Sequence, residues 1–222
     1  MTDRHTVSAF DEDMDRIRGY ISEMASRASE QLTNAMKALA TNDHELAKAT
    51  AQADKQIDEL ESEVEKLIVQ TIAIRAPLAD DLRELIAAMK MSAVIERIGD
   101  YSKNIAKRVR RLESRSFIDQ NQQIARMAEI AGEMLRMAMD AYARRDTDLA
   151  EQVCERDNEV DTIFKELFVD LVAYIAKHPE AAQEVAHLVV VTKNIERIGD
   201  HATTCAEMIY FAETGNQLGE DR

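Results

Sequence analysis

The sequence is poor in the residues that interrupt helices or build β-sheets. Its 222 residues include 6 glycines, 2 prolines, 5% aromatic residues and no tryptophan. Sandwiches and barrels need many turns and many aromatic strand residues, and Gly-loop α/β enzymes need glycine-rich turns, so this composition disfavours all three classes. A hydrophobic content of 45% is too high for a disordered chain. The length suits one large domain or two small ones with a substantial core.

Long apolar runs and an export signal are also missing. No segment approaches the ~18 uncharged apolar residues that a membrane helix needs. The most apolar short run, 185–191, is soon followed by Lys193, and residues 1–15 are acidic without a hydrophobic signal core. The two cysteines, Cys154 and Cys205, are expected to be small buried hydrophobic residues rather than functional thiols. We therefore expect a cytoplasmic protein with no direct membrane insertion.

Positive charge is in short supply. The chain has 28 Lys and Arg against 42 Asp and Glu, which gives a formal net charge of −14. A nucleic-acid-binding protein should show a basic stripe, and binding to an anionic lipid surface also depends on clustered basic residues. We therefore expect neither nucleic acid nor a bare membrane surface as a partner.

Helical periodicity runs through almost the whole chain. Apolar residues recur at spacings of three and four, and the pattern is interrupted at 41–43, 76–77, 114–116, 145–146 and 178–179. Asp43 is expected to cap the second helix, and Asp80 or Asp81 the third. These interruptions predict six helices, most of them roughly 25–33 residues and therefore roughly 40–50 Å long. Helices of this length with short connections are typical of antiparallel bundles.

A six-residue segment occurs twice in the chain. Residues 95–100 and 195–200 both read Ile-Glu-Arg-Ile-Gly-Asp, an identity expected by chance in about one of several thousand chains of this length, so a duplication explains it better. Upstream, matching residues are offset by 103 rather than 100: Met24, Leu32, Met36, Asp43, Leu46, Asp54 and Asp58 correspond to Met127, Leu135, Met139, Asp146, Leu149, Asp157 and Asp161. We predict an all-α fold of two tandem, pseudo-symmetric antiparallel three-helix bundles, at 1–114 and 115–222, joined near Ser114 to Phe117.

Carboxylates recur at positions i and i+4 in both repeats. The four pairs are Asp54 with Asp58, Glu96 with Asp100, Asp157 with Asp161, and Glu196 with Asp200. Residues at this spacing share a helix face, where like charges repel and a multivalent cation would reverse the sign of the interaction. Random placement of the acids would give roughly eight such pairs, so a single pair indicates only a solvated surface. Four pairs at matched positions favour a metal site.

The acids and the residues around them limit which metal ions and which enzyme classes are expected. Gly99 and Gly199 lie inside predicted helices, where glycine costs about 1 kcal/mol relative to alanine, and a close approach of backbone or ligand would explain them. An all-carboxylate ligand set favours Mg, Mn, Ca or iron. Helical-bundle di-iron enzymes add a Glu-x-x-His pair, which neither Glu96 nor Glu196 begins. Hydrolase motifs are also missing, so we expect no catalytic residue, and we expect Arg97 and Arg197 to pair with nearby acids.

The paired motif resembles that of the PhoU family of phosphate-transport regulators. Residues 100–106 and 200–203 continue the family pattern, residues 74–83 are similar to its inter-helix connection, and the similarity spans about residues 5 to 213. The resemblance implies two similar three-helix bundles whose acid pairs bind a divalent or transition metal ion, such as iron, manganese, magnesium or zinc. Carried over to this sequence, the candidate ligands are Asp54, Asp58, Glu96 and Asp100 in the first bundle, and Asp157, Asp161, Glu196 and Asp200 in the second.

The resemblance also implies a role and partners. It implies a non-enzymatic negative regulator of the phosphate-starvation response and of phosphate uptake, which couples the ATPase of a phosphate ABC transporter to a sensor histidine kinase. At high phosphate it would promote the kinase's phosphatase-like state and restrain uptake. We expect a cytoplasmic homodimer that reaches the inner face of the membrane only through these partners. A carboxylate-bridged metalloenzyme of helical-bundle type is the alternative.

Overall fold

The chain is almost entirely helical. A computed structural model describes residues 2–112 and 118–219, and the predicted junction near 114–117 lies outside them. The first half contains α1 (Thr2–Thr41), α2 (His44–Ala53), α3 (Lys55–Arg75) and α4 (Asp80–Val109); the second contains α5 (Ile118–Arg144), α6 (Thr147–Lys177), the short 3₁₀ helix η1 (Pro179–Ala181) and α7 (Ala182–Thr214). Asp54 alone separates α2 from α3, and its φ of −50° and ψ of −38° are still helical. Counting α2 and α3 as one rod, the described residues form the six long helices that the periodicity predicts.

The helix ends follow local side-chain chemistry, and they repeat. The carboxylate of Asp43 accepts a hydrogen bond from the backbone N–H of Leu46 at 2.9 Å, and Asp146 accepts one from Leu149 at 3.0 Å. These bonds satisfy N–H groups that the first turn of a helix leaves free. The prediction that Asp80 or Asp81 caps α4 is wrong, because Ala79 occupies the cap position with a φ of 49° and no side-chain bond. Asp80 and Asp81 lie within the first turn instead, where their negative charges interact favourably with the helix dipole.

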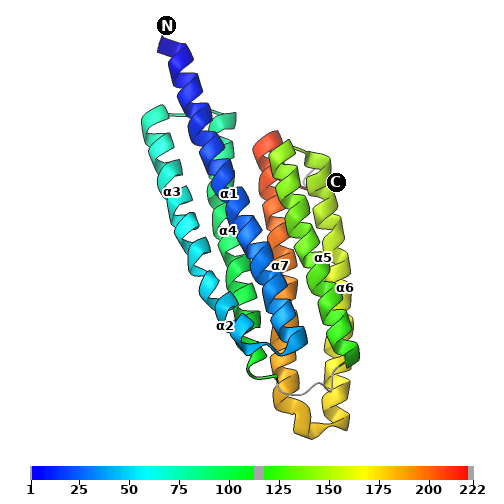
Figure 1. Ribbon diagram of the computed structural model, residues 1–222. Helices are drawn as coiled ribbons and strands as arrows, with labels where there is room; N and C mark the ends of the chain where they lie inside the picture. The colour runs from blue at the N-terminus through cyan, green and yellow to red at the C-terminus, as the bar shows by residue number, and fades with distance from the viewer. Residues whose placement is uncertain (1, 113–117, 220–222) are drawn as a thin grey trace.

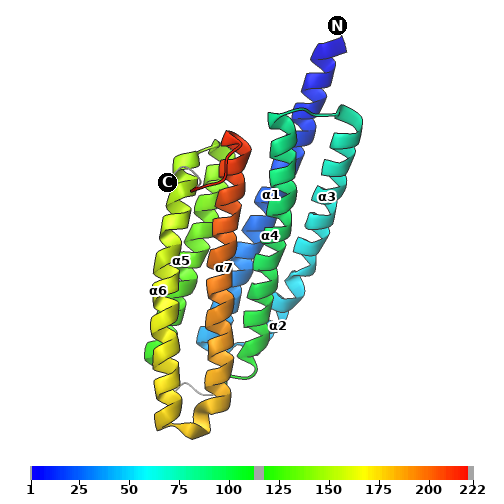
Figure 2. The ribbon, with the colours of Figure 1, turned by 180° about the vertical axis from the view of Figure 1, so that it is seen from behind.

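The helices form two sets that lie side by side. Figures 1 and 2 show α1, α2–α3 and α4 in one set, and α5, α6 and α7 in the other. The sets meet where α4 runs antiparallel along α7, with a second contact between α1 and α5. The predicted arrangement of two pseudo-symmetric three-helix bundles is therefore confirmed.

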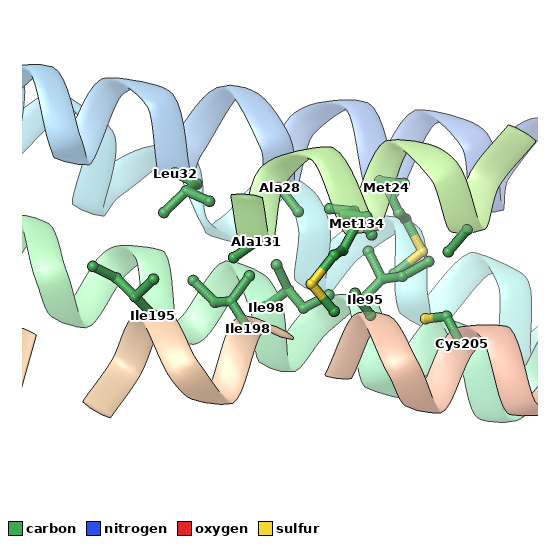
Figure 3. Close-up of a cluster of buried hydrophobic side chains, with 14 of the residues drawn as sticks. Met24, Ala28, Leu32, Ile95, Ile98, Ala131, Met134, Ile195, Ile198 and Cys205 are labelled. Carbon is green, nitrogen blue, oxygen red and sulfur yellow. The ribbon is translucent and has the colours of Figure 1, made fainter. Parts of the chain in front are cut away.

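The hydrophobic core is continuous across both bundles. Figure 3 shows side chains of α1, α4, α5 and α7 packed together where the bundles meet. Ile95, Ile98, Ile195 and Ile198, the isoleucines of the repeated motif, are all 0% exposed. Cys205 is buried as predicted, whereas Cys154 is only half-buried. The same four isoleucines thus fix the position of the motif acids that follow them along each helix.

The surface carries some large apolar side chains. Val69, Ile74 and Leu78 are exposed on α3 and just beyond its end, and Phe168, Val169 and Val172 are exposed on α6. Within residues 2–112 and 118–219, none of the helices has a stretch long and apolar enough to cross a bilayer.

Candidate functional site

The two copies of the motif meet at the seam between α4 and α7. The ring of Tyr101, one residue past the first motif, packs edge-on against His201, which follows the second, with centroids 5.2 Å apart. The Arg197 guanidinium lies over the Tyr101 ring at 5.6 Å. The predicted pairing of Arg97 with acids is confirmed, because its guanidinium lies 3.7 Å from Glu96 and 3.8 Å from Asp100. An aromatic and cationic contact therefore joins the two copies of the motif beside their acids.

The motif glycines allow α3 to approach α4 closely in the first bundle, and α6 to approach α7 in the second. A Cβ on Gly99 would lie 2.9 Å from the Cδ1 atom of Ile57, and a Cβ on Gly199 would lie 2.8 Å from Oδ1 of Asp157. Both distances are too short for a real contact, so alanine would push the neighbouring side chain away. The predicted close approach at these glycines is confirmed, and at Gly199 it brings a carboxylate against the helix backbone.

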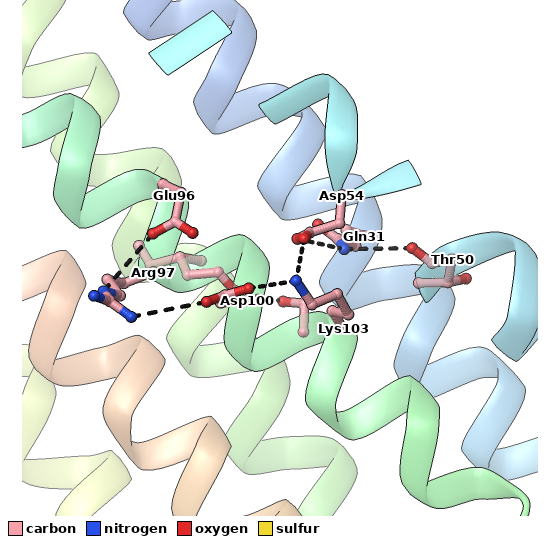
Figure 4. Close-up of polar contacts among 9 residues, drawn as sticks. Gln31, Thr50, Asp54, Glu96, Arg97, Asp100 and Lys103 are labelled. Carbon is pink, nitrogen blue, oxygen red and sulfur yellow. Dashed lines mark hydrogen bonds and ion pairs between the residues drawn. The ribbon is translucent and has the colours of Figure 1, made fainter. Parts of the chain in front are cut away.

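In the first bundle, two of the predicted acids lie on either side of a lysine (Figure 4). The Lys103 ammonium donates to Oδ1 of Asp100 at 2.5 Å and also to Oδ2 of Asp54. Asp54 is only 3% exposed, and its other oxygen accepts a 3.2 Å hydrogen bond from the amide of Gln31. Gln31 also donates to the carbonyl of Thr50. The structure thus brings Asp54 and Asp100 together, with the single positive charge of Lys103 between them.

The outer acids of the first bundle influence each other electrostatically. Burial, reinforced by the negative charges of Asp100 and Glu61, raises the pKa of Glu96 to about 7. Burial and the negative charge of Asp54 raise the pKa of Asp58, although this side chain lies on the exposed side of the set. Burial also raises the pKa of Glu61. Asp58, Glu96 and Asp100 therefore form one negatively charged group, to which Glu61 also belongs.

In the second bundle, the central acid has no counter-charge bonded to it. Oδ1 of Asp157 is buried and has no hydrogen-bond partner within the described part of the chain. Burial, and then the negative charges of Asp200, Asp161 and Glu196, raise the pKa of Asp157 to about 6. Burial and the charge of Glu196 also raise the pKa of Asp200.

The two remaining acids of the second bundle have lysine partners. Lys193 bonds to both carboxylate oxygens of Glu196, and Lys165 bonds to Asp161 at 3.0 Å on the exposed surface. Neither bond involves Asp157. The negative charge of this bundle is therefore concentrated at Asp157 and Asp200.

Five polar residues of these sites were not predicted from the sequence. Lys103 and Lys193 lie three residues from a motif acid on the same helix, and Lys165 lies four residues from Asp161, so their spacing alone was a usable signal. Glu61 lies one turn beyond Asp58 and carried the same signal. Gln31 comes from a different helix, α1, and the sequence gives no local indication that it contacts Asp54.

The donor chemistry of the second bundle fits a hard cation. Among residues 2–112 and 118–219, no three His, Cys, Asp or Glu side chains are close enough to share one metal ion as they stand. The unpartnered oxygen of Asp157 nevertheless lies in the space that the missing Cβ of Gly199 leaves, with Asp200 as an electrostatic neighbour. Carboxylate oxygens are the ligands that Mg, Mn and Ca prefer. In the first bundle, Lys103 already lies between Asp54 and Asp100, so the fit there is poorer.

Asp157 makes the stability of the protein depend on pH. Because its pKa is raised from 3.8 to about 6, the folded state holds a proton that the unfolded state releases, and stability falls as pH rises between these values. In EDTA we expect Asp157→Asn to remove this fall and to stabilise the protein at pH 7.5 by about 1 kcal/mol, a figure reduced for solvent screening. At pH 3.5 the two proteins should be equally stable. Urea unfolding across this pH range measures the effect.

Asp54→Asn is the matched control, since it occupies the corresponding position in the first bundle but removes a bond to Lys103. This variant should be less stable than the unmodified protein at pH 7.5. Equal pH profiles for Asp157→Asn and the unmodified protein would contradict the assignment of the fall to Asp157.

Comparison with known proteins follows the same division of the chain. The family model described as "PhoU domain" matches residues 21–109 and 124–209. The chain belongs to the PhoU family. All eight acids of the four pairs fall inside the two matched PhoU segments, one set in each.

Individual PhoU relatives match over nearly their whole length. The chain is 46% identical to the "phosphate-specific transport system accessory protein PhoU homolog" of Zymomonas mobilis, over 97% of this chain and 91% of that protein. It is 38% identical to the protein of the same description from Rhizobium meliloti, over 100% of this chain and 94% of that one. The crystal structure of PhoU from Pseudomonas aeruginosa superposes with a TM-score of 0.88 at 31% identity, covering 93% of this chain and 100% of that chain.

Proposed function

We propose that this protein is a negative regulator of the phosphate-starvation response and of phosphate uptake, which couples a phosphate ABC transporter to a sensor histidine kinase. The observation that carries the proposal is membership of the PhoU family in both halves of the chain. Relatives that match from end to end are described as accessory proteins of the phosphate-specific transport system. The negative sign of the regulation and the two partners come from the resemblance of the motif to this family.

The site geometry favours a regulator over the alternative of a carboxylate-bridged metalloenzyme. A di-iron enzyme of the helical-bundle type builds its centre from convergent Glu and Glu-x-x-His ligands. Here Lys103 lies between Asp54 and Asp100, and Lys193 holds Glu196. Lysines bonded to these acids suit a charge-balanced binding site better than an open metal centre that activates oxygen. We therefore propose that the protein is not an enzyme.

A metal ion belongs to this proposal as a ligand of the acid sets. Asp157 and Asp200, with Asp161 and Glu196 beside them, would hold a divalent or transition metal ion in the second bundle. When bound, such an ion supplies positive charge that offsets the repulsion among these carboxylates and joins α6 to α7. Asp54, Asp58, Glu96 and Asp100 are the corresponding acids of the first bundle.

The surfaces available to partners include exposed apolar side chains. Val69 of α3 and Val172 of α6 are examples, and both helices lie away from the seam between the two bundles. Such side chains favour contact with a second copy of the chain or with a partner protein. We propose a cytoplasmic homodimer that docks on the transporter ATPase and the kinase.

Deletion of the gene in its own bacterium tests the regulatory role. In high-phosphate medium, a reporter of phosphate-starvation genes is expected to turn on in the deletion strain and to turn off again when the gene is restored. A reporter that stays off in the deletion strain would contradict negative regulation. Asp157→Asn/Asp200→Asn, introduced at the native locus, tests whether the second acid set contributes to the regulation.

A pull-down with purified partners tests the coupling. The tagged protein should retain both the transporter ATPase and the cytoplasmic part of the sensor kinase, each added separately. Retention of neither partner by folded protein would rule out direct coupling. Retention of the ATPase alone would limit the role to control of transport.

A further inference from the structure

The two acid sets have the same carboxylates but different neighbours. Superimposing the repeats by their sequence offsets pairs Asp54 with Asp157, and Asp100 with Asp200. The two side chains that bond to Asp54 are replaced in the second repeat: the neutral Thr203 stands where the first repeat has Lys103, and the apolar Met134 stands where it has Gln31. Duplication therefore preserved the acids of both sites, whereas the groups that bind those acids diverged.

In the first bundle, Lys103 does what a bound cation would do. Its ammonium bonds to carboxylates from two different helices, Asp54 between α2 and α3 and Asp100 on α4. A lysine ammonium bonded to two carboxylates carries a positive charge at neutral pH. Positive charge is thus already present between the acids, on a side chain that cannot diffuse away.

In the second bundle, the corresponding position offers no positive charge. The Thr203 hydroxyl donates to the backbone carbonyl of Gly199 at 3.2 Å, along its own helix. Met134 is fully buried and apolar. Lys193 bonds to both oxygens of Glu196, and Oδ1 of Asp157 has no hydrogen-bond partner among residues 2–112 and 118–219. Lys103 and Gln31 bind Asp54 in the first bundle. Asp157, its counterpart in the second bundle, has no corresponding side chain to offset its charge.

We infer that Lys103 is a tethered counter-ion that takes the place of a metal ion in the first bundle, so that a multivalent cation binds only to the second. The inference rests on the proposed metal binding of the acid sets, and it makes the two halves of the protein functionally unequal. It also assigns Lys103 and Thr203 as the residues that decide which half binds the ion.

Manganese binding to the full-length protein tests this assignment. Protein stripped with EDTA and dialysed is titrated with Mn²⁺, and the free ion is followed by electron paramagnetic resonance, with total manganese measured by elemental analysis. The unmodified protein should bind Mn²⁺ in a manner that Asp157→Asn/Asp200→Asn weakens about tenfold or more and that Asp54→Asn/Asp100→Asn leaves unchanged. Circular dichroism confirms that each variant is folded.

Exchange of the two deciding residues makes the test reciprocal. Lys103→Thr should add Mn²⁺ binding that Asp54→Asn abolishes, and Thr203→Lys should weaken the existing binding about tenfold or more. If Lys103→Thr adds no binding, or if Asp54→Asn/Asp100→Asn removes the binding of the unmodified protein, the inference is wrong while metal binding itself stands. If neither the unmodified protein nor Lys103→Thr binds Mn²⁺, both fail. Binding by Lys103→Thr alone would support the counter-ion role and remove the second-bundle site.

Discussion

Ile198→Ala is expected to lower the free energy of unfolding by about 2–5 kcal/mol, because it deletes a fully buried side chain and leaves a cavity. Ile198 lies on α7, which packs against α4, in the same buried cluster as Ile98 of the other repeat (Figure 3). Since the core is continuous across this seam, the loss should destabilise both bundles at once. Chemical denaturation followed by circular dichroism should show a single transition moved to lower denaturant concentration.

Ile198→Val provides the control, since it removes one methylene from the same place and should cost about 0.5–1.5 kcal/mol. A second probe, a fluorophore attached to Cys154 of the second bundle in a Cys205→Ala background, reports on one bundle alone. Coincident transitions from the two probes support one cooperative unit. Two separated transitions would show that the bundles unfold independently, and that the seam contributes little to stability.

Much of the fold could be predicted from the sequence because helices and their ends depend on local chemistry. The periodicity of apolar residues predicted the rods, and Asp43 caps the helix that it was expected to cap. The cap of α4 could not be predicted in this way, because the backbone there adopts a positive φ at Ala79, outside the pattern of capping side chains. The antiparallel contact of α4 with α7 was also beyond the sequence pattern, since it depends on how two finished bundles pack.

The candidate site was predictable in its acids but not in its charge balance. Spacing placed Asp54 and Asp58 on one helix face, yet Asp54 is buried and Asp58 is exposed. The depth of a side chain depends on the helix packed against it, here α4 at Gly99, and not on the spacing along its own helix. The amide of Gln31 reaches Asp54 from a third helix, so only the packed bundle reveals the contact.

The glycine of the motif affects both the packing of the helices and the charge balance of the site. Gly99 and Gly199 are costly in a helix, and the cost is explained by the close approach of α3 and α6. At Gly99 the nearest atom is apolar, from Ile57, whereas at Gly199 it is a carboxylate oxygen of Asp157. One glycine thus serves packing, and the other also makes room for an unpaired charge. The replacement of Lys103 by Thr203 has the same consequence, since it also leaves Asp157 without the positive charge that Asp54 has.

Lys103→Met is expected to lower the free energy of unfolding in EDTA by about 2–3 kcal/mol, because it leaves Asp54 buried without its counter-ion. Methionine preserves most of the apolar stem of lysine, so the loss reports on the charge rather than on packing. The estimate is at the low end for a buried pair, since the lysine side chain is 23% exposed. Thermal and urea unfolding at pH 7.5 measure it.

Two further variants decide whether the loss belongs to the pair. Lys107→Met removes an exposed lysine one turn further along α4 and should change stability by less than about 0.5 kcal/mol. Adding Asp54→Asn to Lys103→Met should restore part of the lost stability, because the buried charge disappears with its partner, and the coupling energy should be about 1–3 kcal/mol. Strictly additive effects of the two substitutions would show that Lys103 stabilises α4 by other contacts. Lys103 bonds to Asp54 at the start of α3 and to Asp100 on α4. A coupling energy of this size would show that Lys103 holds α3 against α4 in the first bundle.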